Sequence, residues 1–279
     1  MKKSSLFKQK VPRMSDNILH ESIRQVMRGG NQVVNFSWQG GEPTLMGIPF
    51  FEKAISCQQQ FQIPGQIVIN GLQTNGLLID HEWAKFLSEE KFLVGLSIDG
   101  PQHIHNRYRL LKGGAPSWER VCRAGDILLE NNVDINVMSV VNDHSAQFPE
   151  EIYDFHKSKN LIHMQFIPCL EFETQDREQA TSYSVNSRNY GEFLCRLFDC
   201  WIADFQNGLP STFIGFFDSV LHTYIEEQPP ECTLLEECGL YIIVEHNGNV
   251  YSCDFFVNDD NYLGNIKDDL LHDLLNSEK

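Results

Sequence analysis

Hydrophobic positions along the chain follow two alternating patterns. Short runs rich in Val, Ile and Phe are separated by stretches whose apolar residues recur every three or four positions, which is typical of parallel strands connected by helices. The predicted strands are 33–38, 66–73, 93–98, 134–141 and 163–168. The predicted helices are 49–61, 81–92, 117–131, 149–159 and about 186–206. Because these β-α units repeat at roughly 30 residues, we predict an α/β fold that forms a full or partial barrel.

The first predicted element is a helix rather than a strand. Ser15 or Asp16 can cap its start, and Gly29 and Gly30 can end it. Residues 1–14 contain too few apolar positions to predict a strand before this helix. We therefore expect the first strand of the barrel to be absent and the sequence to begin inside a larger fold.

The pattern changes after residue 226, where the Pro-rich segment EEQPPEC predicts a division into domains 1–226 and 227–279. Two short strands around Asn247-Gly248 predict a β-hairpin with a type I′ turn, which this dipeptide favours. The last segment, IKDDLLHDLLNSEK, is amphipathic and predicted to be helical. No helix-terminating signal follows Lys279, so we expect the sequence to be cut at this end as well.

Composition excludes several classes of partner. A formal net charge of -16 and a pI near 5.0 disfavour a surface for nucleic acid, which requires clustered Lys and Arg. No apolar run reaches the roughly 18 to 20 residues of a membrane span. The polar start MKKSSLFKQK also lacks the apolar stretch of a signal peptide. We expect a soluble, cytoplasmic protein without a nucleic-acid or membrane partner.

The sequence contains eight cysteines, which divide by their setting, with Cys169 alone at the end of a predicted strand. Four lie in stretches of helical periodicity and are expected to pack as small apolar side chains: Cys57, Cys122, Cys195 and Cys200. Cys232, Cys238 and Cys253 instead gather around the predicted hairpin. Thiolates placed this way suit an iron-sulfur cluster or a zinc ion, although each usually takes four ligands. The alternative is three thiols packed beneath a small domain.

Polar and glycine-rich motifs follow four of the predicted strands. They are SWQGGEPTL at 37–45, QTNG at 73–76, LSIDGP at 96–101 and IPCLE at 167–171. Barrel enzymes place their sites at the carboxyl ends of the strands, and paired glycines let the backbone approach a ligand closely. Each motif alone is also compatible with ordinary turn chemistry. Their shared location favours one site at this edge of the sheet.

The segment HIHNRYR at 103–109 places two histidines two residues apart. That spacing could serve a metal on a strand, but the segment follows a Gly-Pro turn, and we predict a polar loop. Arg109 would then be available for a carboxylate or a cofactor, because its planar guanidinium suits such groups.

Read together, these motifs resemble those of the anaerobic sulfatase-maturating enzymes, which are radical S-adenosylmethionine (SAM) proteins with a SPASM-type extension. The resemblance extends from about Val11 over nearly the whole length. It implies a partial (β/α)6 barrel, here lacking its first strand and cluster loop, followed by the start of a SPASM-type domain. It also implies oxidation of a cysteine or serine of a sulfatase to formylglycine. The cofactors would be SAM and [4Fe–4S] clusters, with an electron donor such as flavodoxin or ferredoxin.

The resemblance further implies roles for individual residues. Gly41 would contact the amino group of SAM, and the other residues of the cofactor site would be Gln39, Gly40, Glu42, Ser97, Arg109 and Leu170. Three of the four ligands of the first auxiliary [4Fe–4S] cluster would be Cys232, Cys238 and Cys253. Asp254 would be the general base, because forming the aldehyde or thioaldehyde requires a proton to leave the substrate Oγ or Sγ.

The sequence departs from the family pattern in two respects. It contains no CxxxCxxC motif, whose thiolates hold the SAM-cleaving cluster, and it stops before the further cysteines of the family. We therefore expect a fragment of a longer protein that is inactive alone. Two other functions stay open: maturation of a different peptide, or a cluster-free remnant that binds a peptide or nucleotide. The adjacent Cys253 and Asp254 favour the sulfatase branch.

Overall fold

The computed structural model describes residues 13–173, 179–225, 227–237 and 241–277. The chain packs as two compact units. The first comprises Met1–Phe36, Met46–Ile69 and Glu236–Lys279, and the second comprises Ser37–Leu45 and Asn70–Leu235. The predicted domain division at 226/227 stays a prediction.

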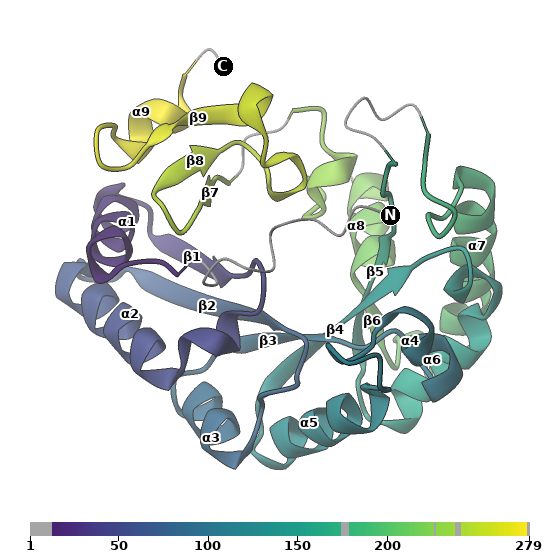
Figure 1. Ribbon diagram of the computed structural model, residues 1–279. Helices are drawn as coiled ribbons and strands as arrows, with labels where there is room; N and C mark the ends of the chain where they lie inside the picture. The colour runs from purple at the N-terminus through teal and green to yellow at the C-terminus, as the bar shows by residue number, and fades with distance from the viewer. Residues whose placement is uncertain (1–12, 174–178, 226, 238–240, 278–279) are drawn as a thin grey trace. The chain divides into compact units, whose positions relative to one another are not determined.

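The larger sheet has six strands in the order β1-β2-β3-β4-β5-β6 (Figure 1). Their bounds are β1 Val33–Trp38, β2 Ile67–Thr74, β3 Leu93–Ser97, β4 Asp134–Val141, β5 His163–Pro168 and β6 Phe213–Ile214. Strands β2 to β6 pair in parallel. Sequential order with helical crossovers is the topology of a β/α barrel, so the predicted α/β fold is confirmed. Strand β6 was not predicted, because two residues are too few to show a pattern.

Helices alternate with these strands, and Figure 1 shows α3, α5, α6 and α7 on the outer face of the sheet. The bounds are α1 Asp16–Arg28, α2 Ile48–Phe61, α3 His81–Glu89, α4 Gln102–Tyr108, α5 Trp118–Glu130, α6 Pro149–Ser158, α7 Ser187–Ala203, α8 Gly215–Tyr224 and α9 Leu271–Leu275. The prediction of a loop at 103–109 was wrong, because α4 forms there. Its Ile104 and His105 are buried, and this burial stabilises a helix that the polar sequence does not suggest.

Three helices of the barrel end in the same way. The second residue after α3, α5 and α6 has a left-handed φ of 53° to 56°: Lys91, Asn132 and Asn160. The next residue donates its N–H to the carbonyl five positions earlier and buries its side chain: Phe92, Val133 and Leu161. This is the Schellman arrangement. It explains why the helix predicted at 81–92 ends at Glu89.

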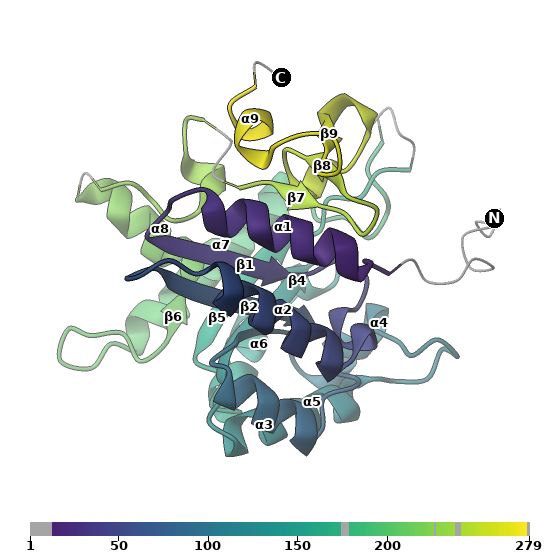
Figure 2. The same ribbon diagram turned by 90° about the vertical axis from the view of Figure 1, so that its left-hand side faces the viewer.

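The first unit joins α1 to a small antiparallel sheet (Figure 2). Its strands are β7 Ile243–Val244, β8 Asn249–Tyr251 and β9 Tyr262–Asn265. Ile18 of α1 packs in one apolar cluster with Val250 and Leu271. The Gln25 side chain accepts a hydrogen bond from the Leu271 backbone N–H at 2.7 Å. The helix predicted at the start of the chain thus packs against its last described elements.

The predicted hairpin forms, but its turn differs from the predicted type I′. The Gly248 N–H donates to the Glu245 carbonyl at 2.8 Å, so His246 and Asn247 are the central residues. Gly248 has a φ of 90°, whereas Asn247 is not among the described residues with positive φ. A three-residue loop with glycine in the left-handed position fits this geometry. The third strand, β9, was not predicted.

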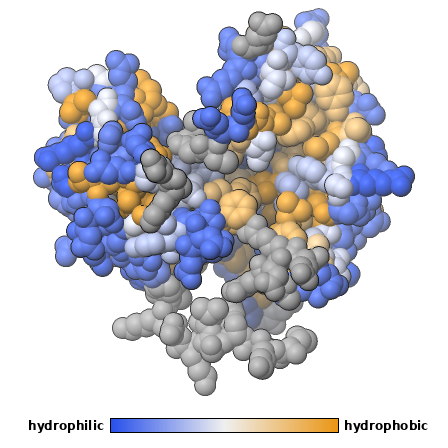
Figure 3. Space-filling view, turned by 90° about the horizontal axis from the view of Figure 1, so that it is seen from above, coloured by the Kyte–Doolittle hydropathy of each residue, from blue (hydrophilic) through white to orange (hydrophobic). Residues whose placement is uncertain are grey.

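The surface seen from above is largely hydrophilic at its periphery, with apolar patches between (Figure 3). Hydrophilic cover agrees with the net charge of -16. Within the described part of the chain, no helix combines the length and apolar content needed to cross a membrane. The predicted helix at the C-terminus is limited to Leu271–Leu275 among the described residues.

Candidate functional site

The carboxylate of Glu42 connects the loop after β1 to the end of β2. Its Oε1 accepts hydrogen bonds from the hydroxyls of Thr44 at 2.6 Å and Thr74 at 2.8 Å. Its Oε2 accepts from the Asn75 backbone N–H at 2.8 Å. Both threonines are buried. Glu42 therefore anchors the Gly-Gly-Glu-Pro loop through both of its oxygens, and two predicted strand ends do meet at one place.

The anchored loop leaves its two glycines open. Gly40 and Gly41 have φ angles of 90° and 59°, in the left-handed region that favours glycine. Apart from each glycine and its two chain neighbours, no described atom lies within 4 Å of where a Cβ would stand on either residue. The backbone groups of this turn are thus accessible to a ligand. A small molecule with an amino group and a carboxylate fits such a turn, because both groups can bond to backbone.

The end of β3 is tied to β2 through a side chain. Gln73 Nε2 donates to Ser97 Oγ at 3.0 Å. The Gln73 amide crosses directly over Gly95, where an added Cβ would lie 2.0 Å from Gln73 Oε1 and 3.0 Å from Met138 Sδ. A side chain at position 95 would therefore displace Gln73 and release Ser97.

We predict that Gly95→Ala lowers the free energy of unfolding by about 1 to 2 kcal/mol, since Gln73 must leave its position and lose its hydrogen bond. In a Gln73→Ala background the same substitution should cost less than about 0.5 kcal/mol. Urea unfolding of the four proteins of this double-mutant cycle measures the difference. Equal costs of Gly95→Ala in both backgrounds would contradict the contact.

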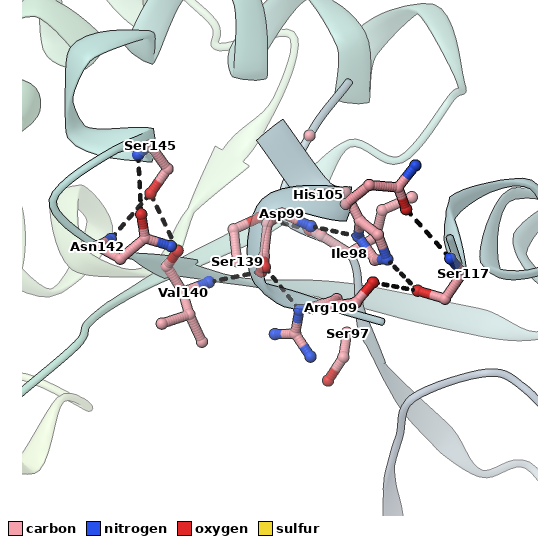
Figure 4. A network of polar contacts seen from close by, with 12 residues as sticks. Ser97, Ile98, Asp99, His105, Arg109, Ser117, Ser139, Val140, Asn142 and Ser145 are labelled. Carbon is pink, nitrogen blue, oxygen red and sulfur yellow. Dashed lines mark hydrogen bonds and ion pairs between the residues drawn. The ribbon is translucent and has the colours of Figure 1, made fainter. Parts of the chain in front are cut away.

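Asp99 lies in the polar network of Figure 4 rather than openly at the rim. It is 3% exposed, and its Oδ1 accepts from the Val140 backbone N–H at 2.9 Å. Its Oδ2 accepts from Arg109 Nε at 2.6 Å. The Arg109 side chain is 26% exposed, and among the described residues only its Nε makes a side-chain hydrogen bond. Arg109 thus keeps two donors available to an oxygen of a ligand.

Two buried histidines flank the end of β3. His105 Nδ1 accepts from the Asp99 backbone N–H at 3.3 Å. His156 Nε2 lies 3.0 Å from Ser139 Oγ, which donates to the Ile98 carbonyl. Burial lowers the pKa of His105 to about 4 and that of His156 to about 3. The negative charge of Asp99 raises both pKa values, but by less than burial lowers them. Both imidazoles are therefore neutral at pH 7.

We expect these histidines to make the fold sensitive to acid. Above pH 6.5 neither state binds the extra protons, so they do not affect stability. As the pH falls from 6.5 toward about 4, the unfolded chain binds protons that the folded chain refuses. The free energy of unfolding should then fall by up to ~1.4 kcal/mol per pH unit for each histidine. Urea unfolding between pH 7.5 and 5 tests this, because His105→Asn should reduce the slope and His272→Gln, at an exposed position, should not.

The remaining cofactor residues predicted from the sequence lie in the same unit. Gln39 is exposed in the anchored loop, and Leu170 follows β5 with 62% of its surface exposed. Sequence reasoning missed His105 and Ser117 as members of the site. His105 lies in the HIHNRYR segment that was predicted to be a polar loop, and Ser117 belongs to none of the motifs, so only their hydrogen bonds identify them.

The predicted cluster ligands are described only in part. Cys238 lies outside the described residues, while Cys232 belongs to the second unit and Cys253 to the first. Among described residues, no group of three His, Cys, Asp or Glu could hold a metal ion. The three-thiol site therefore stays a prediction.

Asp254 has a phenol as a neighbour that the sequence did not suggest. Tyr241 donates its hydroxyl to Asp254 Oδ1 at 2.9 Å. The same oxygen lies 3.7 Å from Cys253 Sγ, and the Tyr241 hydroxyl lies 3.8 Å from that sulfur. Burial raises the pKa of Tyr241, and the nearby carboxylate raises it further, so the phenol stays protonated and can donate.

The four helical cysteines do not all behave as core residues. Cys122 is buried, and burial raises the pKa of its thiol to about 11. Cys57 and Cys200 are half-buried. Cys195 is exposed on α7, so its assignment to the core was wrong. The helix turns this position outward, since Phe193 and Leu197 on either side of it are the buried residues.

Comparison with known proteins places these features in a family. Residues 7–156 match the radical SAM superfamily, and residues 236–279 match an iron-sulfur cluster-binding domain of the SPASM type. A cysteine-type anaerobic sulfatase-maturating enzyme of Clostridium perfringens is 39% identical over 266 residues, with 95% of this chain and 71% of that protein covered. A serine-type enzyme of Bacteroides thetaiotaomicron is 36% identical, with 100% of this chain and 70% of that protein covered.

Solved structures agree. Native anSMEcpe with bound AdoMet and Cp18Cys peptide aligns with a TM-score of 0.89 at 38% identity, covering 95% of this chain and 73% of that one. Streptococcus suis SuiB bound to S-adenosylmethionine aligns with a TM-score of 0.65 at 14% identity, covering 97% of this chain and 60% of that one, which shows the fold alone. The barrel, the SPASM match and the identities of 36% to 39% over 70% to 71% of the length of two sulfatase-maturating enzymes all indicate the same family. This chain belongs to the anaerobic sulfatase-maturating enzymes, a family of radical SAM oxidoreductases.

Proposed function

We propose that the strand ends of the second unit bind SAM. The observation that carries this proposal is the open backbone of Gly40 and Gly41 on a loop anchored by Glu42. Gly41 would receive the amino group, with Gln39 beside it. The groups lining the rest of the site would be the Ser97 hydroxyl, the free donors of Arg109 and the apolar Leu170. SAM, when bound, supplies hydrogen-atom abstraction.

The substrate class follows from the relatives. Both cysteine-type and serine-type enzymes are similar to this chain, and one solved relative holds a peptide. We propose a sulfatase polypeptide whose cysteine or serine is oxidised to formylglycine. A hydrogen atom leaves the substrate Cβ, a proton leaves Oγ or Sγ, and one electron leaves with them. From serine this gives the aldehyde directly, whereas from cysteine it gives a thioaldehyde that water hydrolyses to the aldehyde with release of hydrogen sulfide. Asp254 would take that proton, and Tyr241 donates a hydrogen bond to its Oδ1.

Two further assignments complete the proposal. Together with a fourth ligand, an auxiliary [4Fe–4S] cluster would be held by Cys232, Cys238 and Cys253. Such a cluster, commonly held by four thiolates, would accept the electron. A flavodoxin or ferredoxin would supply the electron for SAM cleavage. A cytoplasmic location, where such donors and reduced thiols occur, stays a prediction.

Equilibrium binding tests the SAM site directly. Isothermal titration calorimetry of the 279-residue chain with SAM should give saturable binding that Arg109→Met weakens by about 30-fold or more, since two charge-assisted hydrogen bonds are lost. Arg123→Met removes an exposed arginine of the same unit and should leave the dissociation constant unchanged. Equal effects of the two substitutions would argue against the site.

Anaerobic reconstitution with iron and sulfide tests the cluster. Visible cluster absorption should appear and should fall in Cys232→Ala but not in Cys195→Ala, which removes an exposed thiol. A chain that takes up neither iron nor SAM would instead favour a cluster-free binding protein. Zinc uptake, measured by metal analysis, would reassign the thiols.

A further inference from the structure

Arg109 belongs to a closed circuit of hydrogen bonds whose other members are Asp99, His105 and Ser117 (Figure 4). The Asp99 backbone N–H donates to His105 Nδ1, so the imidazole proton is on Nε2. His105 Nε2 donates to Ser117 Oγ at 3.0 Å, and Ser117 Oγ donates to the Arg109 carbonyl at 2.7 Å. The Arg109 Nε then donates to Asp99 Oδ2. The arginine is thus held at both its backbone and its side chain.

The hydroxyl of Ser117 serves this circuit instead of its nearest helix. Ser117 occupies the N-cap position of α5, where a serine normally accepts a backbone N–H of the first turn, yet its side chain makes no capping bond. The capping role is taken by Asn106, whose Oδ1 accepts the N–H groups of Ser117 and Trp118 at 3.1 Å each. Because Asn106 caps the helix in its place, the Ser117 hydroxyl is available to the Arg109 carbonyl.

The side chains of the circuit are buried, except for that of Arg109, which is partly exposed. Asp99, His105 and Ser117 are 3%, 0% and 4% exposed, whereas the Arg109 side chain is 26% exposed. Hydrogen bonds in such a setting lose little to competing water. The low pKa of the buried imidazole keeps it neutral, so its donor and acceptor nitrogens stay in these roles at neutral pH.

We propose that Asp99, His105 and Ser117 are positioning residues for Arg109. They hold the guanidinium in one orientation, with Nη1 and Nη2 presented to an oxygen acceptor of the cofactor. A side chain already fixed in its bound orientation loses less conformational entropy when the ligand arrives. The proposal rests on the proposed function in that Arg109 must meet SAM.

Ser117→Ala tests the proposal with a small change. The substitution removes only the hydroxyl that reaches the Arg109 carbonyl, while Asn106 keeps the cap of α5. By titration calorimetry, SAM should bind about 10-fold more weakly, the loss typical of an outer residue that orients a ligand-binding group. Thr212→Val is the matched control, because it removes another buried hydroxyl, bonded to Tyr153 and remote from Arg109. Its affinity should change by less than about 2-fold.

A second measurement separates this proposal from the proposed function. The Nε–H resonance of Arg109 in nitrogen-15 NMR reports the order of the guanidinium without any ligand. It should be sharp and protected from exchange in the original chain and in Thr212→Val, and broadened in Ser117→Ala. An unchanged resonance in Ser117→Ala, or equal affinities of the two variants, overturns the positioning role. Failure of the original chain to bind SAM overturns the proposed function instead, and the resonance still decides the positioning.

Discussion

Replacement of Asp99 by alanine should lower the free energy of unfolding by about 3 kcal/mol. The change leaves the Val140 backbone N–H without its acceptor and Arg109 Nε without its carboxylate. Removing one partner of a buried charged pair costs more than the pair itself contributes, because the other group stays dehydrated and unpaired. Arg109 is partly exposed, which allows some rehydration and limits the loss. Urea unfolding at pH 7.5 measures it.

A second ion pair of the same unit provides the comparison. Asp204 accepts from Lys157 and from the Tyr153 hydroxyl, but its side chain is 27% exposed and that of Lys157 is 33% exposed. Asp204→Ala should therefore cost only about 1 kcal/mol, because water screens a partly exposed pair and can rehydrate the group that is left. If the two alanine variants lost the same stability, burial would not be the source of the Asp99 effect.

Replacement of Glu42 by alanine should abolish measurable SAM binding and lower the free energy of unfolding by about 2 to 3 kcal/mol. The carboxylate is the shared acceptor of the Thr44 hydroxyl, the Thr74 hydroxyl and the Asn75 N–H. Without it, buried donors lose their partner, and the Gly40-Gly41 turn is no longer fixed to the end of β2. Calorimetric titration and urea unfolding measure the two effects.

Glu52→Ala is the matched control for this change. Glu52 is exposed on α2, and its removal should alter neither stability by more than about 0.5 kcal/mol nor affinity. Glu42→Gln adds a finer test, because an amide keeps one acceptor but offers N–H groups where Asn75 already donates. It should bind SAM less tightly than the original chain yet more tightly than Glu42→Ala. Full affinity in Glu42→Ala would contradict the anchoring role.

The sequence by itself predicted the alternation of strands and helices and the shared edge of the sheet where Glu42 joins the ends of β1 and β2. Alternation of apolar runs at two periods is a local property, and it survives in the structure because each face of an element meets a similar environment along its length. Ser15 caps α1 as its sequence position indicates. The Gly-Gly-Glu-Pro loop was found for the same reason, since its residue types report an unusual backbone.

Only the tertiary structure decided what the polar residues of the site do. Glu42 and Thr74 are 32 residues apart, and Asp99 and Val140 are 41 apart, so no local pattern could pair them. The helix α4 likewise forms because its His105 is buried against Ser117, which a sequence window cannot show. Hydrophobic periodicity determines which face of an element is buried. The partner of a buried polar group depends instead on which distant backbone lies within about 3 Å, and folding alone settles that distance.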